Sequence, residues 1–273
     1  MPVETQHPDY IKNLPKWTLA RTCFDGPIAV RKAGTLLLPN PDKDDNDRYA
    51  AYVARAQFLN VVSRTVNAMV GMAFRKASTI EVKGIDYIEE NATGTGTTLE
   101  QLGKIVVGEL DLVGRFGLLT DYPEAKEDEG EKKAPSKEQV KRLGLEASIK
   151  TYSAESIINW KTAVIGGKTM LSMVTLEERY DVDGDEFSQE TKTQYRVLKM
   201  VDGKCVVEIW RDEEVSSSYQ PKADGKLLDR IPFDIAGTES NDPEVDSAPM
   251  YDIAEILIGH YRNSADYEEG IFL

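Results

Sequence analysis

The sequence predicts an α+β fold with helices at both ends of the chain and strands in the middle. Apolar residues recur every three or four positions across residues 8–74 and again across 247–273, as in amphipathic helices. Between residues 148 and 235, short apolar or alternating runs are separated by glycine and aspartate turns, which is typical of antiparallel strands. We therefore divide the chain into four segments: 1–123, 124–147, 148–246 and 247–273.

The first segment is predicted to contain helices followed by short strands. Its proline- and aspartate-rich residues 39–47 predict a loop between two helices. A short strand at 79–82 and a glycine-containing loop at 93–98 come next, and the following helix is capped by Thr97 or Thr98. We assign its apolar face to Leu99, Leu102, Ile105, Val106, Glu109 and Leu110. A strand over 113–120, broken by Gly114 and Gly117, is expected to end this segment.

The middle of the chain combines a charged insertion with a series of strands. Residues 124–142 mix both charge signs with almost no apolar side chains, which predicts a flexible or protruding segment. Gly166-Gly167 and Asp202-Gly203 suit tight hairpin turns between strands. The predicted strands are 148–152, 157–161, 169–180, 193–200, 204–211 and 231–235.

The last segment carries the clearest helical pattern. Ser247 is a candidate N-cap, and Pro249 suits the first turn, where a missing N–H does no harm. Asp252 and Glu255 complement the positive end of the helix dipole. We assign one face of this helix to Ile253, Ile256, Leu257, His260, Tyr261 and Ser264.

Composition indicates an acidic, soluble protein of a reducing compartment. The net charge is -14, so the surface as a whole repels nucleic acid instead of wrapping it through phosphate contacts. Cys23 and Cys205 stand far apart without a CxxC partner, which predicts neither a disulfide framework nor a thiolate metal site. The first residues do not form a secretory signal, and no apolar run approaches the roughly 20 residues of a membrane span.

The phosphate-binding patterns in the sequence are incomplete. Gly167-Lys168-Thr169 resembles the end of a P-loop, but the required earlier glycine is replaced by Thr162, and predicted strands flank it. A hairpin turn is the better interpretation. The loop that contains Gly94 and Gly96 lacks the third glycine of a dinucleotide fingerprint, so we interpret it as a flexible connection.

Calcium-binding patterns are also incomplete. Asp42, Asp44 and Asn46 have the first spacings of an EF-hand loop, but its glycine is replaced by Asp47 and its closing glutamate by Val53. In the series Asp181, Asp183 and Asp185, Gly184 comes two positions too early. Both stretches are interpreted as solvated loops, and no metal or cofactor is expected.

The sequence offers few candidate bases for nucleophilic catalysis. Its only histidines are His7, near the N-terminus, and His260, on the apolar stripe of the last helix. A lone histidine on such a stripe is more often a packing residue than a base. Carboxylate pairs that form only in three dimensions stay open as an alternative. We predict that the chain is not an enzyme.

Several longer phrases occur in a fixed order along nearly the whole chain. They are Asp25-Gly26 with Val30-Arg31 and Ala33-Gly34, Leu38-Pro39, residues 70–76, 114–123 and 152–160, Arg196-Val197-Leu198, Ile231-Pro232-Phe233, and residues 260–268. This series resembles an uncharacterised-domain family of tailed phages and prophages that is similar to portal proteins.

The resemblance implies a portal subunit: one copy in a ring, commonly a dodecamer, that forms the capsid-vertex channel for DNA packaging and ejection and joins head to tail. It implies a portal-like α+β fold, with a helical and α/β wing-like region at 1–123, a strand-rich wing or clip region at 148–246, and a stem-like helix at 247–273. Implied partners are further copies of the chain, terminase, head-tail adaptor, scaffolding or capsid proteins and, transiently and without sequence specificity, double-stranded DNA.

The same resemblance implies a place in the virion, at the capsid vertex, and in the host cytoplasm during assembly, with no membrane partner. Family members continue past the position equivalent to Tyr267, so tunnel-lining and crown elements are expected to be missing from this chain. Candidate oligomer contacts lie on the last helix: Ile253, Leu257, His260, Tyr261 and Tyr267.

Two other functions remain open from the sequence. Another capsid-associated protein, such as a minor head or adaptor protein, would share these phrases only locally and would bind an existing portal. A metal-dependent nuclease built from scattered aspartate and glutamate residues is the enzyme alternative, in which two ions would clamp an in-line displacement.

Overall fold

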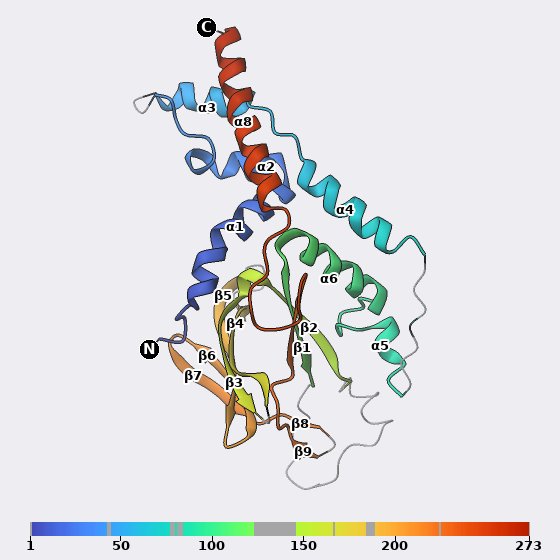
Figure 1. The fold of residues 1–273 in the computed structure, drawn as a ribbon. Helices are drawn as coiled ribbons and strands as arrows, with labels where there is room; N and C mark the ends of the chain where they lie inside the picture. The colour runs from blue at the N-terminus through green and yellow to red at the C-terminus, as the bar shows by residue number, and fades with distance from the viewer. Residues whose placement is uncertain are drawn as a thin grey trace.

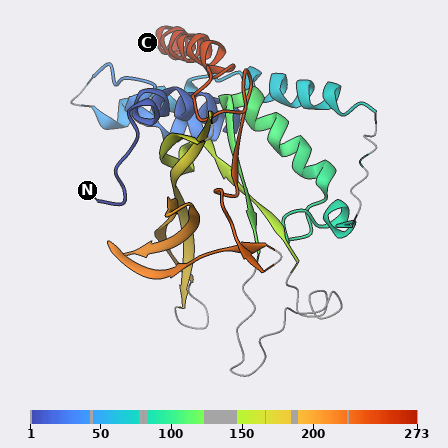
Figure 2. The same ribbon diagram turned by 60° about the horizontal axis from the view of Figure 1, so that its bottom comes forward.

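The fold combines a layer of helices with antiparallel sheets, which confirms the predicted α+β class (Figure 1). The computed structural model describes residues 2–42, 45–76, 80, 84–122, 146–165, 167–183, 189–223 and 225–272. Helix α8 stands at one end of the molecule above α1, and the sheets lie at the other end (Figures 1 and 2). The predicted strand at 79–82 and insertion at 124–142 fall almost entirely outside the described residues.

The helical prediction for residues 8–74 is confirmed. His7 caps the first helix, Asp45 accepts a hydrogen bond from the N–H of Arg48 at the start of the third, and Asn60 accepts one from Ser63 at the start of the fourth. Each cap satisfies an N–H group that the first helical turn cannot pair internally. The helices are α1 (Pro8–Asp25), α2 (Pro27–Lys32), the 3-10 turn η1 (Gly34–Leu36), α3 (Asn46–Arg55) and α4 (Val61–Ala73).

Helix α6 (Leu99–Val113) begins as predicted but ends later. Thr98 and Gln101 form a reciprocal capping box at its start, which confirms Thr98 as the cap. The short helix α5 (Tyr87–Glu90) precedes it. At its end Gly114 adopts φ 78°, a left-handed conformation in which its N–H reaches the carbonyl of Leu110. The prediction that the next strand starts at 113 was therefore wrong: Val113 is the last helical residue.

The smaller sheet has the order β10-β1-β2 and joins distant parts of the chain. Strand β1 (Arg115–Asp121) pairs antiparallel with both β2 (Ser148–Ser153) and β10 (Phe233–Gly237). Gly117 does not break the strand. The ring of Phe233 covers it so closely that a Cβ on Gly117 would lie 2.4 Å from the ring. The glycine therefore permits the close packing of β10 on β1.

The larger sheet has the order β3-β4-β5-β6-β7 and is built from sequential hairpins. Asp202 and Gly203 both have positive φ, 49° and 74°, which confirms the tight turn predicted between β5 and β6. Strand β7 was missed because its residues, EVSSSY, are polar and almost entirely exposed. The strands are β3 (Ile157–Ile165), β4 (Lys168–Asp183), β5 (Gln189–Val201), β6 (Lys204–Arg211) and β7 (Glu214–Tyr219), and β8 (Lys222–Ala223) pairs separately with β9 (Lys226–Leu227).

The last helix, α8 (Tyr251–Phe272), starts later than the sequence predicts. Its first helical hydrogen bond runs from the N–H of Ala254 to the carbonyl of Met250, so Ser247 is not its N-cap. The Ser247 carbonyl instead lies against Gly114, at the junction of α6 and β1. None of the described helices is long and apolar enough to cross a lipid bilayer.

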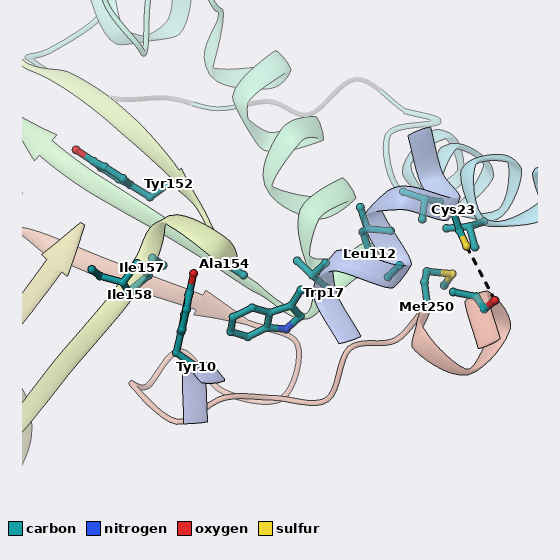
Figure 3. Close-up of a cluster of buried hydrophobic side chains, with 14 of the residues drawn as sticks. Tyr10, Trp17, Cys23, Leu112, Tyr152, Ala154, Ile157, Ile158 and Met250 are labelled. Atoms are coloured by element: carbon teal, nitrogen blue, oxygen red, sulfur yellow. Dashed lines mark hydrogen bonds between the residues drawn. The ribbon is translucent and has the colours of Figure 1, made fainter. Parts of the chain in front are cut away.

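One hydrophobic core connects the first, third and fourth segments. Figure 3 shows the ring of Trp17 projecting from α1 toward Tyr10 and Ala154, with Leu112 of α6 and Met250 nearby. Trp17 is completely buried, and the ring of Tyr10 meets it edge-on at 5.9 Å. Burial of a tryptophan and its neighbours supplies several kcal/mol to folding, so the segments are expected to unfold together.

A buried polar network connects the two larger sheets. Glu178 of β4 accepts hydrogen bonds from Arg196, Gln194 and, across the sheets, the hydroxyl of Tyr152 on β2. Burial alone would raise the pKa of Glu178, but the Arg196 guanidinium and these donors hold it below its ordinary value. The carboxylate is thus an ionised group that folding stabilises.

Replacing Gly114 with alanine should destabilise the protein by about 2 to 5 kcal/mol, since it combines left-handed strain with a Cβ 2.4 Å from the Ser247 carbonyl. The matched control is Gly96→Ala, where φ is 89° but a Cβ would meet no atom within 4 Å. Urea unfolding measures both variants. If both variants lose the same free energy of unfolding, the close approach of the Ser247 carbonyl to Gly114 contributes nothing to the cost of the substitution.

Acid should weaken the fold through Glu178. Because its folded pKa lies below the unfolded value of about 4.3, its contribution is complete above that pH and is lost as the pH falls through the folded pKa. We expect Glu178→Gln to lower the free energy of unfolding by about 1 to 3 kcal/mol at pH 7 and to flatten its decline between about pH 5 and 3. Glu177→Gln, at an exposed neighbouring position, is the control. An unchanged acid slope in Glu178→Gln would contradict this assignment.

Candidate functional site

The five candidate contact residues occupy different environments on α8. Leu257 and Tyr261 are buried in the chain's own core, where Tyr261 meets the ring of Phe58 edge-on at 6.1 Å. Ile253 is half-buried and packs against that core. His260 and Tyr267 are exposed, Tyr267 to 69%. Of the five candidates, only His260 and Tyr267 are therefore exposed enough to contact another chain. Leu257 and Tyr261 instead hold the helix against its own core.

The face of α8 that packs inward is rotated from the predicted one. Ala254, Leu257, Ile258, Tyr261 and Ala265 are its buried apolar residues. Ile256, which the sequence placed on the packed face, is 63% exposed. The spacing pattern alone could not decide this rotation, because isoleucine occurs on both sides of the helix.

An exposed stripe runs along the outer side of α8. Its members are spaced by four, three, four and four residues, which places them on one helical face: Ile256, His260, Asn263, Tyr267 and Ile271. Ile256, Tyr267 and Ile271 expose 63%, 69% and 58% of their surfaces. Ile256, Asn263 and Ile271 were not among the predicted contact residues, although the repeat from position 256 to 271 could have identified them.

Polar contacts fix the far half of α8 to α3. Glu269, which is buried, pairs with Arg48 at 2.8 Å and also with Arg55. Two further contacts lie beside this pair: the Tyr52 hydroxyl donates to Asp266 at 2.5 Å, and the Gln57 N–H donates to the hydroxyl of Ser264 at 2.9 Å. These contacts hold α8 in one orientation.

The charges explain two pKa shifts in this cluster. The hydrogen bond from Arg48, reinforced by Arg55, holds the pKa of Glu269 below its ordinary value. Burial, together with the hydrogen bond to Asp266, raises the pKa of Tyr52. The cluster therefore sets the Glu269 carboxylate against the Arg48 and Arg55 guanidinium groups and keeps Tyr52 as a neutral hydrogen-bond donor.

A second ion-pair cluster anchors α1 beneath α8. Arg21 donates to both oxygens of Glu109 on α6, at 3.0 and 2.7 Å, and to both oxygens of Glu155, at 2.6 and 3.0 Å. Glu109 was placed on the apolar face of α6 by its spacing, and the structure shows instead that this face carries an ion pair. Bidentate pairing positions α1 relative to α6 and the turn after β2.

The histidines and cysteines do not form a nucleophilic arrangement in the described part of the chain. His7 stacks on Trp160 with ring centroids 4.0 Å apart, and the Arg115 guanidinium lies 4.3 Å from the centroid of the same ring. Burial lowers the pKa of His7, with Asp9 opposing and Arg115 reinforcing the shift. Burial also raises the pKa of Cys23 to about 12 and of Cys205 to about 11, so both thiols stay protonated.

The rejected motifs adopt structures other than those of ligand loops. Lys168 opens strand β4 directly after the β3–β4 turn, as the hairpin interpretation predicts. The loop at 93–98 is held by the Asn91 side chain, which accepts from the Gly96 N–H at 2.7 Å. Across the described residues, His, Cys, Asp and Glu do not gather in groups of three that could hold a metal ion. Asp44 and Asp185 of the two calcium-like series lie outside the described residues.

Comparison of the sequence with known protein families found no family that matches it, and comparison with curated proteins found no match either.

Replacing Glu269 with glutamine should loosen the end of α8, because Arg48 and Arg55 would lose their shared negative partner. We expect faster amide hydrogen exchange in residues 264–272, with little change in β4 and β5. Glu268→Gln is the matched control, since Glu268 accepts a longer hydrogen bond, 3.3 Å, from the uncharged Gln57 side chain. Equal exchange in the two variants would show that the ion pair does not hold α8.

Proposed function

We propose that this chain is a structural subunit of a phage portal ring, which forms the capsid-vertex channel for DNA and the head-tail connection. The observation that carries the proposal is the outer stripe of α8, where Ile256, Tyr267 and Ile271 remain exposed on a helix whose opposite side is firmly packed. Large apolar side chains aligned on one side of a rigid helix are typical of a surface that another protein covers.

The positions of the family-like phrases also support the proposal. Residues 114–122 comprise the Gly114 cap after α6 and strand β1, residues 152–160 form the corner between β2 and β3, and residues 260–268 lie in α8. These segments surround the shared core instead of standing in isolated loops. Because the resembling segments belong to one connected core, the resemblance favours a shared fold over similarity confined to short segments.

In a portal-like arrangement, α8 corresponds to the stem-like helix, and the sheets with α6 correspond to the wing and clip regions. The partners are other copies of this chain, terminase, adaptor, and scaffolding or capsid proteins, and the site of action is the capsid vertex after assembly in the host cytoplasm. DNA passes such a channel without being held. A net charge of -14 suits a wall that repels phosphates.

The proposal predicts self-association. Light scattering after size-exclusion chromatography, over a wide concentration range, should give a mass many times the 30.5 kDa of one chain, and negative-stain images should show closed rings. In these rings a neighbouring subunit would cover the exposed stripe of α8. On dilution the rings should therefore separate directly into single chains.

A chain that stays monomeric at high concentration would overturn the proposal, as would open aggregates without closed particles. Monomers that bind a separately purified portal would instead favour the minor head or adaptor alternative. A nuclease would be recognised by cleavage of DNA that requires magnesium or manganese and stops with EDTA.

A further inference from the structure

Helix α4 presents an exposed face unlike the rest of this acidic chain. Arg64, in its first turn, and Arg75, two residues beyond its end at Ala73, are both exposed, and neither has an ion-pair partner among the described residues. Between them lie Ala68, Gly71 and Met72, of which Met72 is 68% exposed and Gly71 has no atom within 4 Å of where its Cβ would be. This α4 face is basic at its two ends and apolar and narrow between them.

The outer side of α8 has the complementary character. Its apolar stripe from Ile256 to Ile271 is bordered by carboxylates, among them Asp252, Glu255 and Asp266, all exposed. Glu255 and Asp266 are eleven positions apart, the same separation as Arg64 and Arg75. At a rise of 1.5 Å per residue, Glu255 and Asp266 lie roughly 16 Å apart along α8. Arg64 lies in the first turn of α4 and Arg75 just beyond its C-terminal end, so the two arginines can meet two carboxylates near opposite ends of the contact.

The two faces cannot meet each other within one chain. The opposite side of α4, with Val62 and Val66, is buried in the core, as is the opposite side of α8, with Leu257 and Tyr261. Both exposed faces therefore point away from the core that the two helices share, and among the described residues neither face is covered. Figure 1 shows α4 and α8 diverging from that core toward different sides of the molecule.

We infer that the α4 face of one chain docks on the outer α8 stripe of a second copy. This inference rests on the proposed function and specifies its subunit contact. Small residues at the centre of the α4 face let the helix backbones approach closely, Tyr267 and Ile271 supply apolar area, and the arginines meet the carboxylates at the rim. Because the two faces differ, the contact is head-to-tail, the type that generates a ring when the rotation closes.

Charge exchange tests the contact. Arg64→Glu with Arg75→Glu on α4 should raise the dissociation constant of self-association by roughly 100-fold or more, because like charges would face each other. Asp252→Lys with Glu255→Lys on α8 should do the same, and it leaves the Tyr52 to Asp266 hydrogen bond intact. The control is Arg179→Glu with Arg230→Glu, an equal charge change at exposed positions outside both faces.

Two combinations make the test specific. Mixing the α4 variant with the α8 variant should restore association, since each supplies the intact face that the other lacks. Combining Arg64→Glu with Glu255→Lys in one chain should also allow association, because the charges of that pair are exchanged across the contact. Circular dichroism and thermal unfolding confirm that every variant is folded.

The outcomes separate this inference from the proposed function. If the unmodified chain associates into rings but the α4 and α8 variants associate as well as the control does, the inference is wrong and the ring stands. Loss of association without recovery in the mixture also contradicts it. A chain that is monomeric without any substitution overturns the ring and the contact together.

Discussion

The burial of α1 is the constraint on which the rest of the structure depends. Trp17, Ala20 and Cys23 are completely buried on one side of this helix, and Trp17 and Cys23 face different parts of the chain. The Cys23 thiol lies 4.0 Å from the carbonyl of Ala254, while Trp17 projects toward the turn after β2 (Figure 3). Because α1 lies between α8 and the sheets, neither the last helix nor the strand-rich segment has a complete core without it.

Specific polar contacts give this apolar centre a single geometry. Hydrophobic burial is non-directional, so by itself it would leave α1 and α8 free to slide and rotate. The bidentate pairs of Arg21 fix α1 against α6, and the pairs of Glu269 fix α8 against α3. With α8 held, the exposed side chains of its outer stripe keep constant positions, which a recognition surface requires.

Local interactions explain the features that sequence reasoning predicted well. The capping box of Thr98 and Gln101 involves residues three apart, and the Asp202-Gly203 turn needs only two residues with positive φ. Such features depend only on residues close together in the sequence. The missed strand β7 is the reverse case, since its polar residues form a strand only because β6 supplies an edge with which to pair.

The sequence by itself determined the helix and strand types, the charge of the surface and the place of α8 at the end of the chain. Only the tertiary structure decided that Ser247 meets Gly114 instead of capping α8, that Glu109 pairs with Arg21, and which side of α8 faces inward. The physical reason is the same in each case. These outcomes depend on partners more than eighty residues away in the sequence. The spacing of apolar residues contains information only about residues within a few helical turns of each other.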